Sequence, residues 1–297
     1  MITIFTTTKP FAGHISIIQK NAIQSWKMCS GGAEILVFDN EEGTAEACKE
    51  LGVRHVPEVK KNKYGTPFIS DIFEQAQNFS VNNVLAYVNA DIMLTSDFPK
   101  TISRVNFPNF LMVGRRIDLD ITERVDFGNP NWEGTIREKV QRKGRLHGYS
   151  GIDYFVFTKD IWQGIPPLVI GRTSWDNWLL YKAVSRGIPL IDATQSITAI
   201  HQNHARYIPA NKKTNVWKGP EAKENKALVG GETHLFSIRD ADFVLTEHGI
   251  QKQDMTIYRI VSFAFRNFER SSFLLKLFLL PGMIAMVLVR KIRRKLA

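Results

Sequence analysis

Asn89-Ala90-Asp91 is the stretch of this sequence whose residue types point most directly to chemistry. The apolar run Val84–Val88 precedes it and Ile92–Leu94 follows it, so a carboxylate is set between two apolar segments. A buried carboxylate is costly unless hydrogen bonds or a cation neutralise it. At a strand end in an open α/β sheet, where ligands bind, a divalent cation on a phosphate can do so. The alternative is a helix N-cap.

Other polar side chains follow the neighbouring predicted strands. Strand ends at one edge of a parallel sheet converge in space, so hydroxyls and carboxylates from distant positions can form one pocket for a nucleotide. Taken singly, each has a structural alternative as a turn residue, a helix cap or a surface charge. Neither a G-x-G-x-x-G turn nor a Walker lysine loop is present, so we expect a metal to hold the phosphates. The residues are Thr6, Thr7 and Thr8 after the first strand, Asp39 after the second, and Asp71 on an intervening helix.

The elements that must position these residues alternate between strand and helix over the first hundred residues. This alternation predicts βαβ units and an α/β fold with a mixed, mostly parallel sheet flanked by helices. Beyond residue 97 the pattern loosens, and residues 205–232 read as a polar, mobile loop. We expect strands at 2–7, 34–38, 53–56, 83–89, 110–114, 154–157, 188–191 and 197–200, and helices at 14–28, 44–51, 68–79, 135–143 and 175–186.

The C-terminus differs in composition from the rest of the chain. Residues 273–289 are apolar apart from Lys276 and are interrupted by Pro281-Gly282, and five Lys or Arg residues follow in the last eight positions. A span of a bilayer takes about 20 apolar residues. We therefore expect a membrane-associating helical segment that lies in the interface, with a helix packed on the domain or in a dimer as the alternative.

Charge and cysteine content limit the partners and the compartment. Subtracting the five tail charges from the net charge of +10 leaves +5, and no nucleic-acid-binding motif occurs, so we expect no nucleic-acid partner. Cys29 and Cys48 form no paired motif, which favours a reducing compartment. The chain enters a strand at Met1–Phe5 without a charged and apolar leader. We expect a cytoplasmic protein, peripheral on the inner face of the cell membrane.

A strand that runs into Asn89-Ala90-Asp91, with a looser second half behind it, resembles the GT-A fold of nucleotide-sugar glycosyltransferases. In that family the strand ends in Asp-x-Asp, and here Asn89 replaces the first acid. The resemblance covers roughly residues 1–204 and implies a nucleotide-binding half (1–97) and an acceptor half (98–204). A loop and helical extension (205–255) and the membrane-associating segment (256–297) would follow. It also implies Mn²⁺ or Mg²⁺ on Asp91, and a nucleotide-diphosphate sugar, foremost a UDP-sugar, bound by Asn89, Asp91 and the strand-end residues above.

Three later stretches resemble further parts of these enzymes. The segment 171–178 is similar to the acidic motif that opens the acceptor-side helix, which implies that Asp176 is the general base of an inverting transfer. His201 resembles the histidine that completes the metal shell, with His204 as second choice. In the glycine-rich stretch 147–154, Gly151 would let the backbone approach the donor. Asp153 would bind sugar hydroxyls or replace Asp176 as the base.

Aromatic and basic side chains could add contacts to the substrates. The aromatic rings could stack on sugar faces, and the guanidinium groups could neutralise the leaving diphosphate, while core packing and surface charge are the alternatives. These side chains are Trp132, Tyr149, Trp175 and Trp178, and Arg115, Arg116 and Arg145.

The resemblance implies a metal-assisted glycosyltransferase that moves a sugar from a nucleotide-diphosphate donor. The apolar and basic C-terminal stretch favours a lipid-linked or surface-polysaccharide acceptor. A sugar nucleotidyltransferase is one alternative, but it would be expected to carry a glycine-rich, basic turn after the first strand, which residues 6–13 do not supply. A non-catalytic nucleotide-sugar-binding or membrane scaffold protein is another.

Overall fold

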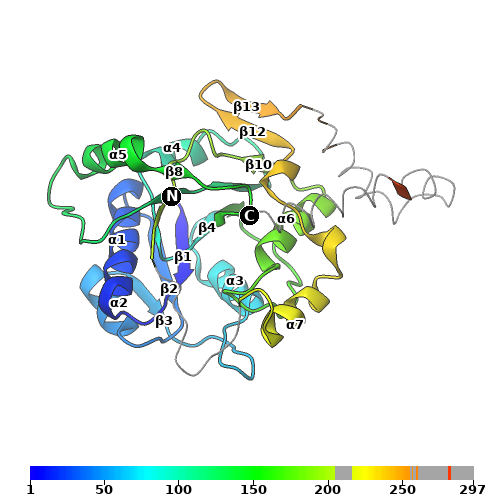
Figure 1. Ribbon diagram of the computed structural model, residues 1–297, viewed down its shortest axis with the longest axis horizontal. Helices are drawn as coiled ribbons and strands as arrows, with labels where there is room; N and C mark the ends of the chain where they lie inside the picture. The colour runs from blue at the N-terminus through cyan, green and yellow to red at the C-terminus, as the bar shows by residue number, and fades with distance from the viewer. Residues whose placement is uncertain (205–215, 255, 257–258, 260–279, 282–297) are drawn as a thin grey trace.

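The computed structural model describes residues 1–204, 216–254, 256, 259, 280 and 281 (Figure 1). Its centre is a nine-stranded sheet of order β13-β12-β10-β6-β9-β4-β1-β2-β3, and a four-stranded sheet of order β5-β11-β7-β8 accompanies it. The strands of the large sheet are β1 (Thr3–Thr7), β2 (Glu34–Phe38), β3 (Arg54–Val56), β4 (Val84–Val88), β6 (Leu111–Arg115), β9 (Ile152–Thr158), β10 (Leu190–Asp192), β12 (Phe243–Thr246) and β13 (Gly249–Lys252). Those of the small sheet are β5 (Ile92–Met93), β7 (Ile117–Leu119), β8 (Arg145–Leu146) and β11 (Ile200–Gln202).

The strand directions confirm the expected mixed, mostly parallel sheet. Strand β9 is antiparallel to both of its neighbours, β4 and β6, and β12 is antiparallel to β13. The remaining neighbours in the large sheet are parallel. Because β9 runs against β4, the beginning of β9 lies at the same edge as the end of β4. Residues before β9 are thereby brought beside those that follow β4.

Helices cover both faces of the large sheet (Figure 1). They are α1 (Gly13–Ser30), α2 (Thr44–Leu51), α3 (Ile69–Phe79), α4 (Asp97–Ile102), α5 (Trp132–Lys143), α6 (Trp175–Ser185) and α7 (Pro220–Leu228), with short 3₁₀ helices η1 (Glu232–His234) and η2 (Ile238–Asp240). Side chains alternate between the faces along each strand. Phe5 of β1 packs in the core with α3 and α6, whereas Ile4 packs in the core with α1, α2 and α4.

The segment beyond residue 204 contains more regular structure than its composition predicts. Within the expected loop 205–232, residues 205–215 lie outside the described residues, and residues 220–228 form α7 instead of a loop. Helix α7 starts with Pro220 in its first turn, a favourable helix start. Buried Asn225 holds α7 by hydrogen bonds to the backbone N and O of Val169, at 2.9 and 3.0 Å. Strands β12 and β13 extend the large sheet, so this sheet includes residues that follow the expected domain boundary at residue 204.

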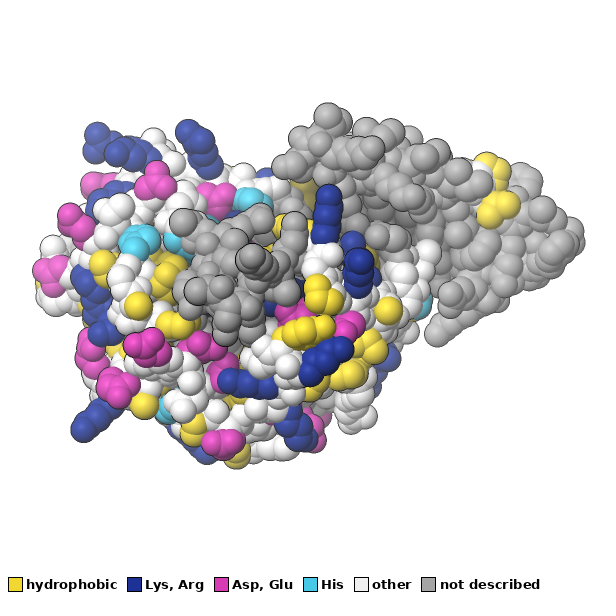
Figure 2. Space-filling view, turned by 60° about the horizontal axis from the view of Figure 1, so that its bottom comes forward, with side chains coloured by type: hydrophobic (Ala, Val, Ile, Leu, Met, Phe, Trp, Pro, Cys, Tyr) yellow, Lys and Arg dark blue, Asp and Glu magenta, His cyan; other side chains and the backbone are white. Residues whose placement is uncertain are grey.

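The expected membrane-associating segment, 256–297, lies outside the described residues apart from four positions. Within the described part of the chain, every helix is too short or too polar to cross a bilayer. Figure 2 shows one face of the molecule, on which Lys and Arg side chains are interspersed with Asp and Glu.

Candidate metal centre

The turn after β4 directs Asp91 to the edge of the sheet. The N–H of Ile92 donates to the carbonyl of Asn89 at 3.0 Å, and the chain continues directly into β5. The nearest helix, α4, begins only at Asp97, so the helix-cap alternative for Asp91 is wrong. Gln202 fixes the backbone of this turn, because its N–H donates to the carbonyl of Asp91 at 3.1 Å.

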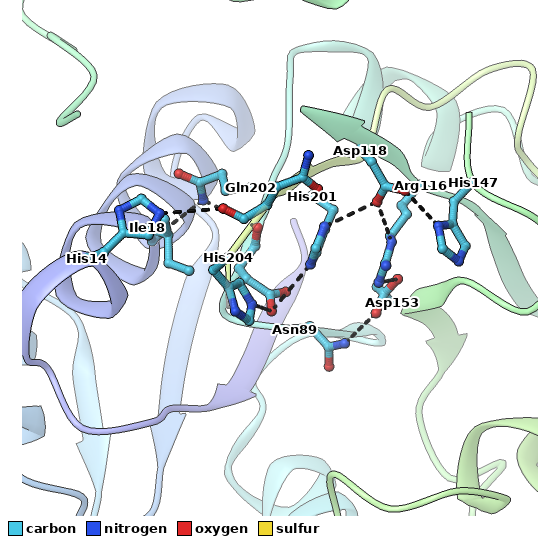
Figure 3. Close-up of polar contacts among 12 residues, drawn as sticks. His14, Ile18, Asn89, Arg116, Asp118, His147, Asp153, His201, Gln202 and His204 are labelled. Atoms are coloured by element: carbon cyan, nitrogen blue, oxygen red, sulfur yellow. Dashed lines mark hydrogen bonds and ion pairs between the residues drawn. The ribbon is translucent and has the colours of Figure 1, made fainter. Parts of the chain in front are cut away.

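Strand β11 brings two histidines to Asp91. It pairs antiparallel with β5, and His201 lies opposite Ile92. The Nε2 atom of His204 lies 3.1 Å from Oδ2 of Asp91, and Nε2 of His201 lies 3.9 Å from the same oxygen. One ligand atom from each of the three side chains lies within 4.8 Å of the others. The structure thus brings both candidate histidines to the predicted metal ligand (Figure 3).

The protonation of this cluster suits metal binding. Burial alone would raise the pKa of Asp91, but the hydrogen bond from His204 and the positive charge of Lys9 outweigh it and lower this pKa, and the two histidines add to this effect at low pH, where they are protonated. Burial lowers the pKa of His201, more strongly than the nearby carboxylates raise it. At neutral pH the cluster therefore presents an ionised carboxylate and a neutral imidazole, the forms that bind metals.

The donor set also fits a divalent ion. The second carboxylate oxygen of Asp91, Oδ1, is buried and has no hydrogen-bond partner among the described residues. A buried oxygen without a partner is costly and is expected to meet an ion or a polar ligand. One carboxylate with two imidazoles suits a first-row ion such as Mn²⁺ better than Mg²⁺, which prefers oxygen ligands.

A second polar cluster adjoins the first. On β7, Asp118 lies opposite His201 of β11, with its Oδ1 3.2 Å from Nδ1 of that histidine. Arg116 Nε donates to Oδ1 of Asp118 at 2.9 Å, and His147 Nδ1 lies 2.7 Å from Oδ2. Burial would raise the pKa of Asp118, but these partners lower it. Asp118 and His147 are not among the site residues predicted from the sequence, although Ile117-Asp118-Leu119 repeats the pattern of an acid between apolar residues.

Asn89 and Asp153 form the far end of the same network (Figure 3). The amide Nδ2 of Asn89 donates to Oδ1 of Asp153 at 2.6 Å, and Tyr87 donates its hydroxyl to Oδ1 of Asn89 at 3.0 Å. The other carboxylate oxygen of Asp153 accepts from Arg116 Nη1 at 2.9 Å. Asn89 is thus a donor to a neighbouring acid, a role that a second aspartate could not fill.

The predicted nucleotide-binding residues of the first half make contacts within the protein. Thr6 Oγ1 donates to the carbonyl of Thr7 at 3.1 Å, and Thr8 Oγ1 lies 3.1 Å from the hydroxyl of Thr44. Asp39, 2% exposed, has a left-handed backbone with φ of 78° and forms an ion pair with Lys61.

Asp71 braces the chain before α3. It accepts from the N–H of Lys60 at 2.8 Å and from Gln75 at 2.7 Å. A role in nucleotide binding for Thr6, Thr7, Thr8, Asp39 and Asp71 stays a prediction.

The acceptor-side residues come from two other elements. Asp176 lies in the first turn of α6, two residues after the N-cap Ser174, whose φ of 90° is left-handed. The ring of Trp175 packs against Tyr87 in the core, 5.5 Å between centroids, so this aromatic residue is a core residue. Gly151 donates its N–H to the carbonyl of Gly148 at 3.1 Å, and a Cβ at Gly151 would come within 2.5 Å of the His147 ring.

The remaining aromatic candidates divide between core and surface. Trp132 and Trp178 are buried, each in a hydrophobic cluster. Tyr149 is exposed, and the guanidinium groups of Arg115 and Arg239 lie 4.5 and 4.2 Å from its ring centroid.

No family model matches the chain, and no curated protein matches it. One similar solved structure is glucosyl-3-phosphoglycerate synthase from Mycobacterium tuberculosis, at 14% identity over 77% of this chain and 78% of that chain, with a TM-score of 0.43. The same enzyme in complex with Mg²⁺ and UDP matches at 13% identity over 69% of this chain and 72% of that chain, with a TM-score of 0.39.

A mannosyltransferase, PcManGT from Pyrobaculum calidifontis, in complex with GDP-Man and Mn²⁺, matches at 13% identity over 69% of this chain and 57% of that chain, with a TM-score of 0.43. The likeness is distant, so the chemistry of the site rests on the residues of this chain.

Proposed function

We propose that this protein is a metal-dependent glycosyltransferase that moves a sugar from a nucleotide-diphosphate donor, foremost a UDP-sugar, to a hydroxyl group of an acceptor. The observation that carries the proposal is the meeting of Asp91, His201 and His204 beside the carboxyl end of β4. In open α/β sheets this edge is where ligands bind. A bound Mn²⁺ or Mg²⁺ would offset the charge that develops on the departing diphosphate.

The chain's own residues would divide the remaining work. Asp176 would accept the proton of the acceptor hydroxyl as its oxygen attacks the anomeric carbon, which inverts the configuration. The left-handed backbone of Ser174 just before Asp176 supports this role, because such conformations cluster at functional sites. Asp153 is less suited to act as the base, since Asn89 and Arg116 already donate to its two oxygens. It would instead orient the donor sugar.

The acceptor and the location are proposed from the sequence. The apolar and basic stretch 273–297 suits a surface of anionic lipid, so a lipid-linked or surface-polysaccharide acceptor and a position on the inner face of the cell membrane follow. Flotation with anionic vesicles tests this. The full chain should float with the vesicles, and a chain that ends at residue 272 should not. Equal flotation of both would contradict the membrane proposal.

Turnover of nucleotide sugars tests the enzymatic proposal. The protein is incubated with UDP-, GDP- and dTDP-sugars in the presence of Mn²⁺, Mg²⁺ or EDTA, and the released nucleoside diphosphate is measured. We expect release that requires metal and that Asp91→Ala abolishes, whereas Asp126→Ala, at an acid whose Oδ1 only caps the N–H of Gly128, retains it. Metal-independent donor binding without turnover would instead favour a nucleotide-sugar-binding scaffold.

A further inference from the structure

The imidazole of His201 lies between two carboxylates. Its Nε2 lies 3.9 Å from Oδ2 of Asp91, and its Nδ1 lies 3.2 Å from Oδ1 of Asp118 (Figure 3). The second contact is within ion-pair distance but is not aligned as a hydrogen bond, and among the described residues the buried Nδ1 has no other hydrogen-bond partner, so a small rotation of the ring toward Asp118 would satisfy it. A neutral imidazole carries a proton on one nitrogen and a lone pair on the other. A carboxylate beside Nδ1 favours the tautomer with the proton on Nδ1. The lone pair is then on Nε2, the nitrogen on the side of Asp91, where the ion would bind.

Strand pairing fixes this arrangement. Asp118 of β7 and His201 of β11 are opposite each other in a parallel pair, so the two side chains leave the small sheet side by side. The N–H of Ile117 donates to the carbonyl of Ala199 at 2.8 Å, and the N–H of Asn203 donates to the carbonyl of Leu119 at 2.9 Å. Backbone hydrogen bonds on both sides of the pair therefore hold the carboxylate at the ring.

Asp118 is itself held in place. Arg116 Nε lies 2.9 Å from its Oδ1, and His147 Nδ1 lies 2.7 Å from its Oδ2. Arg116 also donates to Asp153 at 2.9 Å, and Asp153 accepts from Asn89 at 2.6 Å. A continuous set of contacts thus runs from His201 to Asn89, which precedes Asp91 by two residues. Movement of Asp118 would disturb the support of His201.

We propose that Asp118 is the positioning residue of the metal centre, and that it orients His201 so that Nε2 can bind the ion. The inference rests on the proposed metal site and adds a residue that does not belong to its ligand set. In metal sites, a carboxylate that accepts the second N–H of a histidine ligand fixes the tautomer and ring orientation, and its loss typically weakens metal binding 10- to 100-fold.

Titration of the full-length protein with Mn²⁺, followed by electron paramagnetic resonance, tests the proposal. We expect the unaltered protein to bind one Mn²⁺, and Asp118→Asn to bind it about 10- to 100-fold more weakly. Asp126→Asn, at an acid that only caps the N–H of Gly128, should bind as the unaltered protein does. Circular dichroism of each variant without metal checks that it is folded.

A double-mutant cycle separates positioning from general loss of structure or charge. In a His201→Ala background, Asp118→Asn should weaken Mn²⁺ binding by less than about twofold, because no imidazole remains to be oriented. Co²⁺ gives a second readout, since the visible absorption of the bound ion should change in Asp118→Asn. Asp118→Asn is nearly isosteric with the native residue, so we expect it to fold and the cycle to decide the question.

The possible failures are distinguishable. Saturable Mn²⁺ binding that is unchanged by Asp118→Asn would overturn the positioning role and leave the proposed metal site intact. An Asp118→Asn change that weakens Mn²⁺ binding equally with and without the imidazole of His201 would also overturn the positioning role, because Asp118 would then act independently of that ring. Absence of saturable Mn²⁺ binding by the unaltered protein would overturn the metal site and this inference together.

Discussion

Asn89→Asp would restore the acid that the Asp-x-Asp pattern carries at this position, and we expect the change to harm the protein. In the native chain Asn89 Nδ2 donates to Oδ1 of Asp153 at 2.6 Å. An aspartate at position 89 replaces this donor with an acceptor, so two carboxylate oxygens would face each other. Tyr87 could still donate its hydroxyl to the new carboxylate, as it does to Oδ1 of Asn89 at 3.0 Å.

The magnitude follows from the lost bond and the added charge. A hydrogen bond to a charged group contributes about 1.5–3 kcal/mol. Two unit charges 2.6 Å apart, the present separation of these atoms, would repel by about 6 kcal/mol at an effective dielectric constant of 20. This value is an upper bound, because the two carboxyl groups can share a proton instead. With Arg116 beside Asp153, we expect Asn89→Asp to lower the free energy of unfolding by about 3 kcal/mol at pH 7.5.

Urea unfolding followed by tryptophan fluorescence measures this change. The loss should be smaller at pH 5 than at pH 7.5, because a carboxyl pair that shares a proton has a raised pKa and is relieved as the pH falls. The exchanged pair, Asn89→Asp with Asp153→Asn, restores one donor and one acceptor and should recover at least half of the loss. Asn109→Asp, at an exposed asparagine, is the matched control and should change stability by less than about 0.5 kcal/mol.

Two results would refute this reasoning. The first is an Asn89→Asp variant as stable as the native protein at pH 7.5. The second is an exchanged pair no more stable than the single variant, which would mean that the amide and the carboxylate do not act as a pair.

Three further predictions concern packing, ion pairing and thiol chemistry. Glu221→Gln should lower the free energy of unfolding by about 3 kcal/mol, because it leaves half-buried Arg172 without its 2.8 Å contact to the buried carboxylate of Glu221. Burial would raise the pKa of Glu221, but its hydrogen bonds lower it, so its contribution to stability is present above about pH 4.5 and is lost below that pH, as urea unfolding between pH 6 and 3 should show. Gly114→Ala should cost about 1–3 kcal/mol in thermal unfolding, because the new Cβ overlaps the Tyr154 hydroxyl, and Tyr154→Phe should reduce the cost. Burial raises the pKa of Cys29 to about 12, so mass spectrometry should find its alkylation at pH 8 about 1,000-fold slower than that of a free thiol; rapid alkylation would contradict this burial.

Local pattern was sufficient to predict the elements of the first half. The expected strand at 34–38 and helix at 44–51 agree with β2 and α2 at both ends. In β2 a short apolar run is followed by polar residues, and α2 ends at Leu51 with Gly52 as its C-cap, where a left-handed φ of 63° is typical. Signals of this kind lie within a few residues of the element that they delimit.

Where long-range contacts decide the structure, local pattern was not enough. The polar helix α7 gains stability from Asn225 and Glu221, whose partners Val169 and Arg172 lie about 50 residues earlier, so its sequence read as a loop. A site role for Asp118 could not be predicted from local pattern, because its proximity to His201 depends on the pairing of β7 with β11.

The role of Asn89 likewise depends on a contact between residues far apart in the sequence. The sequence placed His201 and Asp91 in one site but treated Asn89 only as a departure from the Asp-x-Asp pattern. The bond between Asn89 and Asp153, which are 64 positions apart, became visible only once β4 and β9 were aligned.

The wide separation in sequence of the metal-centre residues has a consequence for folding. Asp91 and His204 are 113 positions apart, and closing a loop of that length costs about 4 kcal/mol of chain entropy. During synthesis the carboxylate would emerge long before either histidine, so an ion could not be bound by all three until β11 had joined the small sheet. An ion present at 100 times its dissociation constant would then add about 2.7 kcal/mol to the folded state alone. The supply of metal would thereby influence how long the finished protein survives, as well as whether it can act.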